Sequence, residues 1–547
     1  MIKNRLIIFI LGIYCMFPVV VHAQQSWLVY LKDKQHNDFN PYTYFDAKAI
    51  ERRIRTGIPV DDPSDWPVNE NYTNEIASLV DEVFFASRWF NAVVVQADIH
   101  QMSRVSRLPF VLEIEQLETE EVHLAEYQEY DTTMNPNEAE VLKGQIGTLG
   151  AAEWKKAGID GKGLRIAILD IGFDNADKVP AFDHIRAENH LIATYDFTNR
   201  KNGDFVYYGS GHGTQVWSCI AGKIDDIQIG LATGAEFLLA KTEKRSEKYS
   251  EELNWLAAAE WADKNGADII NSSLGYTGKR YFNWQMDGKT SFVTRAANTA
   301  ARKGILVINA AGNEGEDEWH YIGAPADADS ALAVGGIDPS TGFHTGFSSY
   351  GPTSDKRMKP NVSAFGHVIA AAPNKLNSTQ GTSFASPLVA GFAACAWQTN
   401  RSLTNMQLFR EIEKSGSLYP YFDYAHGFGL PRASHFLAGK ETTPLPTFNV
   451  TERGDSLIII LNNVSVAGES NQGSANPELS AEEVQRPAKS AGEDYFYYNI
   501  MNKSGVIDSY YVLKASQPEV VTILKSDFID GQVLNMHYKG YSETIKL

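Results

Sequence analysis

The middle of the chain alternates short apolar runs with longer segments of helical periodicity. Segments 251–266 and 291–304 have this periodicity and end at glycine. Continuous apolar runs typical of buried parallel strands occupy 164–170, 236–242, 267–275, 305–312 and 331–337. Such alternation predicts a doubly wound α/β parallel-sheet domain over residues 146–438. In that fold, functional sites form at the carboxyl ends of strands.

Two smaller regions flank this predicted domain. Residues 24–118 read as a small α+β domain with strands at 27–32, 81–98 and 109–116 and helices at 45–57 and 99–108. The acidic stretch 119–145 lacks periodicity, which predicts an exposed linker. Residues 439–547 are rich in strand-like segments and predict a β-sandwich-like module, interrupted by a polar loop at 467–494.

The first 23 residues have the pattern of a signal peptide. Lys3 and Arg5 precede an apolar run at 6–21, and Val21 and Ala23 are small residues where a signal peptidase reads the chain. A transmembrane anchor is the alternative, but the run is short for a span. We therefore expect export to the periplasm, the cell surface or the extracellular medium, with no membrane span after signal removal.

Net charge limits the kinds of binding partner that we expect, and the cysteine content limits the disulfides and metal sites. The 547-residue chain carries a net charge of −18, which argues against a nucleic-acid partner because such binding needs a basic surface. Cys15 leaves with the signal peptide, and Cys219 and Cys395 lie in apolar segments. Two buried thiols are the favoured state, although a disulfide stays open. No metal-ligand spacing of Cys and His occurs.

Ser383, in the stretch GTSFASP, raises the question of chemistry. A serine before an apolar helical run is usually a helix cap, so a nucleophile needs a base, an orienting group and oxyanion donors elsewhere. Asp170 ends one predicted strand, His212 lies between glycines, and Asn313 follows another strand. Taken singly, these three read as a turn cap, a loop histidine and a turn asparagine.

Taken together, the motifs resemble those of the subtilisin-like serine proteases, the subtilase family. AILDIGFD (167–174), GHGTQV (211–216) and GTSFASPLVAG (381–391) resemble the family's aspartate, histidine and serine motifs. SSLG (272–275) and AAGNEG (310–315) resemble its substrate-cleft and oxyanion segments. The α/β-hydrolase elbow is the rival, but there the histidine comes last in the chain.

The resemblance implies a secreted serine endopeptidase that hydrolyses peptide bonds through an acyl-enzyme on Ser383. In that reading, His212 is the base, Asp170 orients it, and Asn313 donates to the oxyanion. Protein or peptide substrates would bind along Ser273, Leu274, Gly275, Ala310, Ala311 and Gly312. The chemistry needs no cofactor, and structural calcium, which the family's main calcium loop would hold, is assigned to no site here.

The flanking regions and the departures from the family leave alternatives. Residues 24–118 share the element order of subtilase propeptides, so the chain's own propeptide is an expected partner. The last module loosely resembles accessory or sorting domains of secreted Bacteroidota proteases. Gln215 stands where the family often has a second histidine, and Asn361 and Phe365 where aspartate and proline are usual. The alternative function is a catalytically silent binding or adhesion protein on a protease fold.

Overall fold

The computed structural model describes residues 25–35, 39–117, 122–123, 136–244, 246–247, 250–278, 280–372, 375–437, 444–462, 494–515 and 520–546. The chain divides into a small unit, residues 1–37 and 67–119, and a main unit, residues 38–66 and 120–547. The predicted signal peptide lies outside the described residues, as does the polar loop 467–494 apart from its last residue.

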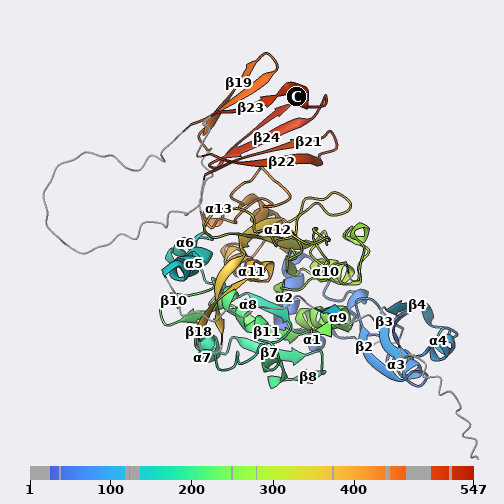
Figure 1. The fold of residues 1–547 in the computed structure, drawn as a ribbon. Coiled ribbons are helices and arrows are strands. Elements are labelled where there is room, and N and C mark those ends of the chain that lie inside the picture. Colours follow the sequence, from blue (N-terminus) through green and yellow to red (C-terminus); the bar gives the residue numbers. More distant parts are fainter. Residues whose placement is uncertain are drawn as a thin grey trace, which may run out of the picture. The chain divides into compact units, whose positions relative to one another are not determined.

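An eight-stranded sheet forms the centre of the main unit (Figure 1). Its order is β16 (Val362–Phe365), β15 (Ala331–Ile337), β14 (Leu306–Ala310), β13 (Ile269–Ser272), β6 (Arg165–Asp170), β11 (Glu236–Lys241), β7 (Leu191–Asp196) and β8 (Lys201–Asn202). All neighbours pair in parallel except β7 and β8. Each apolar run predicted to be a strand is one of these strands, so the doubly wound fold is confirmed.

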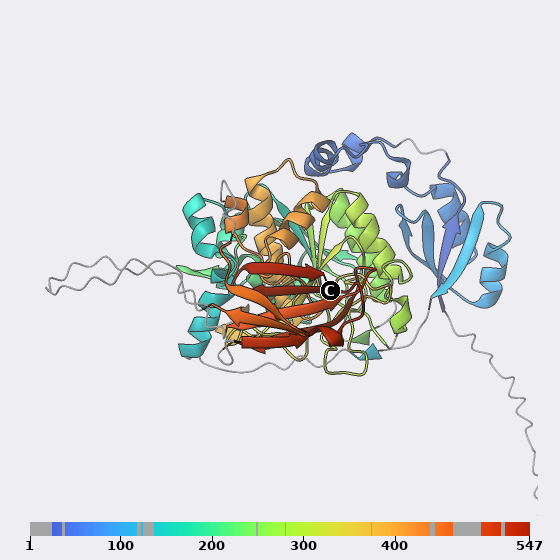
Figure 2. The same ribbon diagram turned by 90° about the horizontal axis from the view of Figure 1, so that it is seen from above.

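Helices cover both faces of this sheet (Figure 2). On one face, α8 (His212–Ala221) packs against α11 (Thr382–Thr399), and on the other, α9 (Ser250–Lys264) packs against α10 (Phe292–Arg302). A Cβ on Gly391 of α11 would lie 2.8 Å from the Ile220 carbonyl of α8, so glycine permits this close approach. Further helices of the domain are α6 (Ala151–Ala157), α7 (Asp183–Ala187), α12 (Asn405–Lys414) and α13 (Ser434–Leu437).

The prediction of an exposed linker over residues 119–145 is wrong for residues 136–145. Helix α5 (Pro136–Gly147) includes these residues and contributes buried Leu142 and Ile146 to the main core. The Gln145 amide, also buried, donates to the carbonyls of Ile229 and Ile369. Of residues 118–135, only β5 (Val122–His123) is described, and it pairs with β12 (Ser246–Glu247).

The small unit is a four-stranded antiparallel sheet with two helices. The strand order is β2 (Glu82–Ser87), β3 (Ala92–Ala97), β1 (Gln25–Leu31) and β4 (Val111–Leu117), with helices α3 (Glu70–Ala77) and α4 (Ile99–Val105). The predicted helix at 45–57 is α2 (Ala47–Thr56), which belongs to the main unit together with α1 (Pro41–Tyr44). The boundaries 24–118 for one N-terminal domain therefore stay a prediction.

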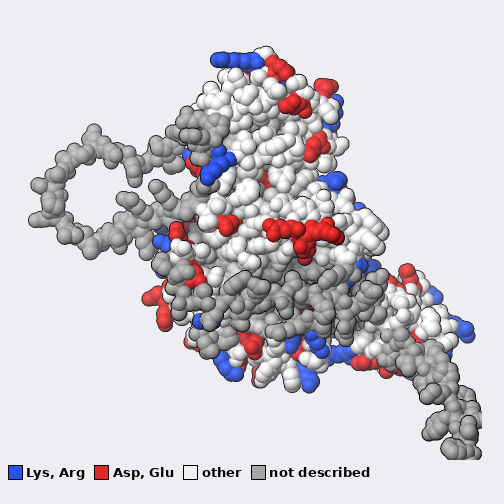
Figure 3. Space-filling model, viewed as in Figure 1, with Lys and Arg blue, Asp and Glu red and all other residues white. Residues whose placement is uncertain are grey.

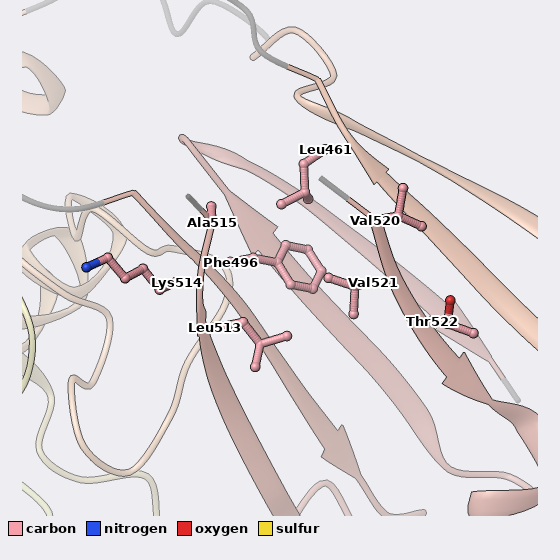
Figure 4. A pocket seen from close by; sticks show the side chains of 8 residues that line it. All are labelled: Leu461, Phe496, Leu513, Lys514, Ala515, Val520, Val521 and Thr522. Atoms are coloured by element: carbon pink, nitrogen blue, oxygen red, sulfur yellow. The ribbon is translucent and has the colours of Figure 1, made fainter. Parts of the chain in front are cut away.

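The C-terminal residues form two antiparallel sheets around their own apolar core. One sheet contains β19 (Phe448–Arg453), β20 (Ser456–Leu461) and β23 (Val520–Leu524), and the other β22 (Ile507–Lys514), β21 (Tyr495–Met501), β24 (Val533–Tyr538) and β25 (Tyr541–Lys546). A cavity of about 200 Å³ lies between the sheets, where Phe496, Leu513 and Val521 point toward one another (Figure 4). This agrees with the predicted β-sandwich-like module.

The structure shows where the charged side chains and the two cysteines lie. Acidic side chains gather in the middle of the face shown in Figure 3. Cys219 and Cys395 are both buried and free, as favoured from the sequence. Within the described ranges, no helix has the length and apolar character needed to cross a bilayer.

Candidate active site

The predicted site residues meet at the carboxyl edge of the central sheet. Asp170 is the last residue of β6, and the neighbouring strands β13 and β14 lead directly into residues 273–275 and 311–313. His212 is the first residue of α8 and Ser383 the second of α11. Adjacent parallel strands end at one edge, so their following segments converge there.

Asp170 and His212 form a direct hydrogen-bonded pair. The Nδ1 of His212 lies 2.8 Å from Oδ1 of Asp170, which also accepts from the Ile171 amide at 2.8 Å. The Asp170 side chain is fully buried and that of His212 is 16% exposed. With Nδ1–H donated to the carboxylate, Nε2 of a neutral His212 keeps its lone pair and can act as a base.

Opposing effects act on the pKa of His212. Burial lowers it, but the negative charge of Asp170, its hydrogen bond to the ring, and the charge of Glu243 raise it by more. The net result is a pKa above the ordinary histidine value. The pair therefore stabilises the imidazolium, which is the form that appears when a base has taken a proton.

Only one of the two glycines beside His212 is required by packing. A Cβ on Gly213 would lie 2.5 Å from the Gly172 carbonyl oxygen and 2.8 Å from the Phe173 ring, and the Gly213 amide donates to that carbonyl at 2.9 Å. A Cβ on Gly211 would have open space. Gly213 thus holds the start of α8 against the end of β6, which brings His212 to Asp170.

Ser383 does not cap its helix. The cap of α11 is Gly381, with no side-chain cap bond, and Ser383 lies within the first turn, half-buried. Its hydroxyl donates to the Ser273 carbonyl at 3.1 Å, and the Ser273 hydroxyl donates to the Ser383 carbonyl at 2.8 Å. The ring of the next residue, Phe384, has its centroid 5.3 Å from that of His212. The first turn of α11, which contains Ser383, therefore lies next to His212.

Asn313 is held with its amide group free to donate. Its Oδ1 accepts from both the amide and the hydroxyl of Thr382, each at 2.9 Å. A Cβ on Gly381, whose φ is +136°, would lie 3.6 Å from Asn313 Nδ2 and 3.7 Å from the Ser383 amide nitrogen. Both nitrogens thus border one small volume beside Gly381, and the Ser383 amide is an unsatisfied donor of a helix first turn. Two donors around one volume can bind an oxyanion.

The expected substrate-binding segments differ in how open they are. Ser273 and Leu274 are buried, whereas Gly275 is exposed, and the Leu274 carbonyl accepts from Asn309 at 3.0 Å. The next residue, Tyr276, pairs with Ala324 as in an antiparallel bridge.

In the second segment, Ala310 and Ala311 are buried and Gly312 is half-buried with a φ of +118°. A Cβ on Gly312 would lie 2.5 Å from Glu314 and 2.6 Å from Ser349, so this turn needs glycine. The Ser349 hydroxyl donates to Glu314 at 3.0 Å, while burial raises the pKa of that carboxyl.

Two contributors to the site carry no clear sequence signal. Thr382 orients Asn313, although it appears in the sequence only as a neighbour of Ser383. Glu243 is buried, accepts from the Tyr276 hydroxyl at 2.6 Å and raises the pKa of His212. It stands in the polar stretch EKRSEK, which resembles a solvated surface run.

No cluster of three or more histidine, cysteine or acidic residues suited to a metal ion occurs in the described part of the chain. Asp225 and Asp226 are exposed between the short strands β9 (Lys223–Ile224) and β10 (Ile227–Gln228).

Two regions of the chain match known protein families. The model of the subtilase family (Peptidase S8) matches residues 161–429, and that of the Bacteroidota peptidase S8 propeptide domain matches residues 26–133. The crystal structure of fervidolysin from Fervidobacterium pennivorans, described as a keratinolytic enzyme related to subtilisin, has a TM-score of 0.54 at 17% identity, covering 94% of this chain and 71% of that one. That likeness establishes the shared fold.

Curated relatives match the catalytic region. Alkaline elastase YaB from Bacillus sp. (strain YaB) is 31% identical over 263 residues, which are 48% of this chain and 61% of the relative. Subtilisin Savinase from Lederbergia lenta is 30% identical over 262 residues, 48% of this chain and 86% of the relative. The chain spans about three fifths of the first relatives' length. From these matches and the fold, the chain belongs to the subtilase family of serine proteases.

Proposed function

We propose that this chain is a secreted serine endopeptidase with Ser383 as nucleophile, His212 as general base and Asp170 as the residue that orients His212. The observation that carries the proposal is the 2.8 Å bond between His212 and buried Asp170, next to the first turn of α11. Membership of the subtilase family supports the reaction class, the hydrolysis of peptide bonds.

Catalysis begins when the Ser383 hydroxyl changes its hydrogen-bond partner. Its proton is donated to the Ser273 carbonyl, so this bond must break before Nε2 of His212 can take the proton. Ser383 Oγ then attacks the substrate carbonyl, and Asp170 stabilises the imidazolium that results. His212 passes the proton to the leaving amine, and water repeats the sequence in reverse to free the acyl group.

The tetrahedral oxyanion occupies the volume beside Gly381. It accepts from Asn313 Nδ2 and the Ser383 amide, and the positive end of the α11 dipole adds to the stabilisation. Because Thr382 already holds the Asn313 oxygen, the amide needs no reorientation as the charge develops. The exposed backbone at Gly275 offers a pairing edge to an extended substrate, and Gly312 borders the pocket for the residue before the scissile bond.

The proposed function includes export of the chain and removal of its N-terminal region. Residues 1–23 direct secretion, residues 24–118 act as a propeptide, and a cut within 118–140 releases the mature enzyme. The match of the propeptide model to residues 26–133 supports this division. The final β module, 439–547, is an accessory domain.

A covalent probe tests the function against the silent alternative. A fluorophosphonate should label the protein on Ser383 and should not label Ser383→Ala. Ser402→Ala, at an exposed serine outside the site, is the matched control and should label as fully as the parent. A folded parent that takes up no probe would favour a catalytically silent binding or adhesion protein.

A further inference from the structure

The C-terminal β module packs on residues 418–428 of the catalytic domain, which we call the bridging segment. The Asn499 amide of β21 donates to the Phe422 carbonyl of this segment at 2.7 Å. The buried apolar side chains of the contact are Tyr497 and Ile507 of the module and Leu418, Tyr421, Phe422, Tyr424 and Phe428 of the segment. The module therefore covers an apolar face of the bridging segment.

A buried histidine of the bridging segment lies directly against the module. The ring centroid of His426 is 5.7 Å from that of Tyr497 in β21. Nδ1 of His426 lies 3.0 Å from the Asp423 carboxylate, and Nε2 accepts the backbone amide of His344 at 3.1 Å. Because Nε2 is an acceptor, the proton is on Nδ1, which donates to Asp423. His426 thus joins the module to residue 344, which lies far from it in sequence.

Residues 343–351, which we call the pocket loop, are held near both ends by these contacts. The start of the loop is bonded to the histidine just described. At its end, the Gly351 amide donates to the Tyr424 carbonyl of the bridging segment at 2.9 Å. The loop also contacts the module itself, since the ring of Phe343 lies 5.6 Å from that of Tyr495 in β21. The position of the pocket loop therefore depends on the surface that the module covers.

The middle of the pocket loop is bonded to the turn that carries the proposed oxyanion donor. The Ser349 amide donates to the Gly312 carbonyl at 3.0 Å, and the Gly315 amide donates to the Phe347 carbonyl at 2.8 Å. Asn313 lies between the two bonded residues of the turn. The pocket loop therefore holds this turn on both sides of Asn313.

From this series of contacts we infer that the C-terminal module positions the active site: Tyr497, acting through His426 and the pocket loop, holds the turn 312–315 in place. The inference rests on the proposed function, because it gives the module a part in the same reaction. Oxyanion donors stabilise a transition state only if they are already in place when the charge develops. A displacement of about 1 Å in such a site can cost about 10²-fold in rate, so a distant contact can matter.

The bridging segment is also bonded to the central sheet, which makes a positioning role separable from a role in folding. The Phe428 amide donates to the Asn361 carbonyl at 2.9 Å, and the Ser363 hydroxyl of β16 donates to the His426 carbonyl at 2.9 Å. These bonds fix the backbone of the segment, whereas Tyr497 packs on the His426 ring. Loss of the Tyr497 ring should therefore leave the fold in place and let the His426 ring turn away from the pocket loop.

Two adjacent tyrosines of β21 provide a matched pair of variants in the full chain. Side chains alternate along a strand, and Tyr498 stacks on Tyr511 of the module, at 4.7 Å between ring centroids. Tyr498→Ala therefore removes the same atoms as Tyr497→Ala but on the other face of the strand. Tyr497→Ala should lower kcat/KM on a peptide substrate by on the order of 10- to 10²-fold, mainly through kcat, because oxyanion donors act in the transition state. Tyr498→Ala, and Tyr497→Phe, which keeps the ring, should stay close to the parent.

Amide hydrogen exchange gives a second measurement that does not depend on activity. In Ser383→Ala protein, the amides of Gly315 and Ser349 should exchange faster with Tyr497→Ala than with Tyr498→Ala, because these amides bond the turn to the pocket loop. If Tyr497→Ala protein fails to fold by circular dichroism, Ile507→Ala, a smaller loss in the same contact, takes its place in both measurements.

The outcomes for the inference and for the proposed function differ. A folded Tyr497→Ala protein with the kcat/KM of the parent would overturn the inference, as would unchanged exchange at Gly315 and Ser349 or an equal loss in Tyr498→Ala. Absence of peptide hydrolysis by the parent itself would count against the proposed function alone, and the exchange comparison would then decide the inference.

Discussion

At the scale of single residues, the contact between Asp170 and His212 should set the pH dependence of the proposed activity. Burial lowers the pKa of His212, but Asp170 and Glu243 raise it above the ordinary value of 6.5. With His212 as the proposed base, activity needs the neutral ring, so kcat/KM should rise with pH through a midpoint above 6.5. Since the folded-state pKa is raised, protonated His212 also stabilises the fold below pH 6.5, and this stabilisation is lost as pH rises through the folded pKa.

The variant Asp170→Asn tests whether Asp170 raises the pKa of His212. The variant should lose about 10⁴-fold in kcat, a magnitude known from serine-protease triads, and its residual activity should titrate at lower pH. A pH–rate profile of both proteins is the measurement. An unshifted midpoint in the variant would mean that Asp170 does not control the ring.

Asn313 should act mainly in the transition state. Asn313→Ala should lower kcat by roughly 10²–10³-fold, the range found for a subtilisin, with little change in KM. Thr382→Val keeps the amide bond to Asn313 but loses the hydroxyl bond, so its kcat should fall by about tenfold at most. Steady-state kinetics on one peptide substrate compares all three proteins, and a large KM effect with normal kcat would make Asn313 a ground-state binder.

At the scale of elements, the junction of β6 and α8 depends on one glycine. Gly213→Ala would place a methyl group 2.5 Å from the Gly172 carbonyl and should cost about 1–3 kcal/mol of unfolding free energy. Gly211→Ala points into open space at a φ of −87° and should cost less than about 0.5 kcal/mol. Urea unfolding in the Ser383→Ala background, which avoids self-digestion, measures both. Equal effects would show that packing at Gly213 is not what positions His212.

The elements also show how far the sequence alone leads. Apolar runs predicted β6, β11, β13, β14 and β15 because buried parallel strands are apolar throughout. Helix α5 was missed because one of its buried residues is Gln145, whose amide bonds to carbonyls distant in sequence. Glu243 was missed for a similar reason, since only folding brings it to Tyr276 and near enough to His212 to raise the pKa of that ring. Motif spacing identifies candidate residues, but contacts with residues distant in sequence determine their burial, their hydrogen bonds and their pKa values.

At the scale of the whole molecule, the loss of residues 24–118 from the precursor should show whether the protein processes itself. Expressed without the signal peptide, the wild-type precursor should lose a fragment of roughly 11–14 kDa from the catalytic chain under denaturing conditions, as expected for about 100 residues plus linker. The Ser383→Ala precursor should keep its full mass. If the wild type also keeps the segment and is fully active, residues 24–118 are a permanent accessory domain.

The most direct test of the account is the turnover of a peptide substrate by purified, folded wild-type and Ser383→Ala proteins. We expect a loss of several orders of magnitude in kcat for the variant, because the substitution removes the proposed nucleophile. Circular dichroism of the two proteins should coincide. Undiminished peptide hydrolysis by folded Ser383→Ala protein would contradict the assignment of Ser383 as the nucleophile.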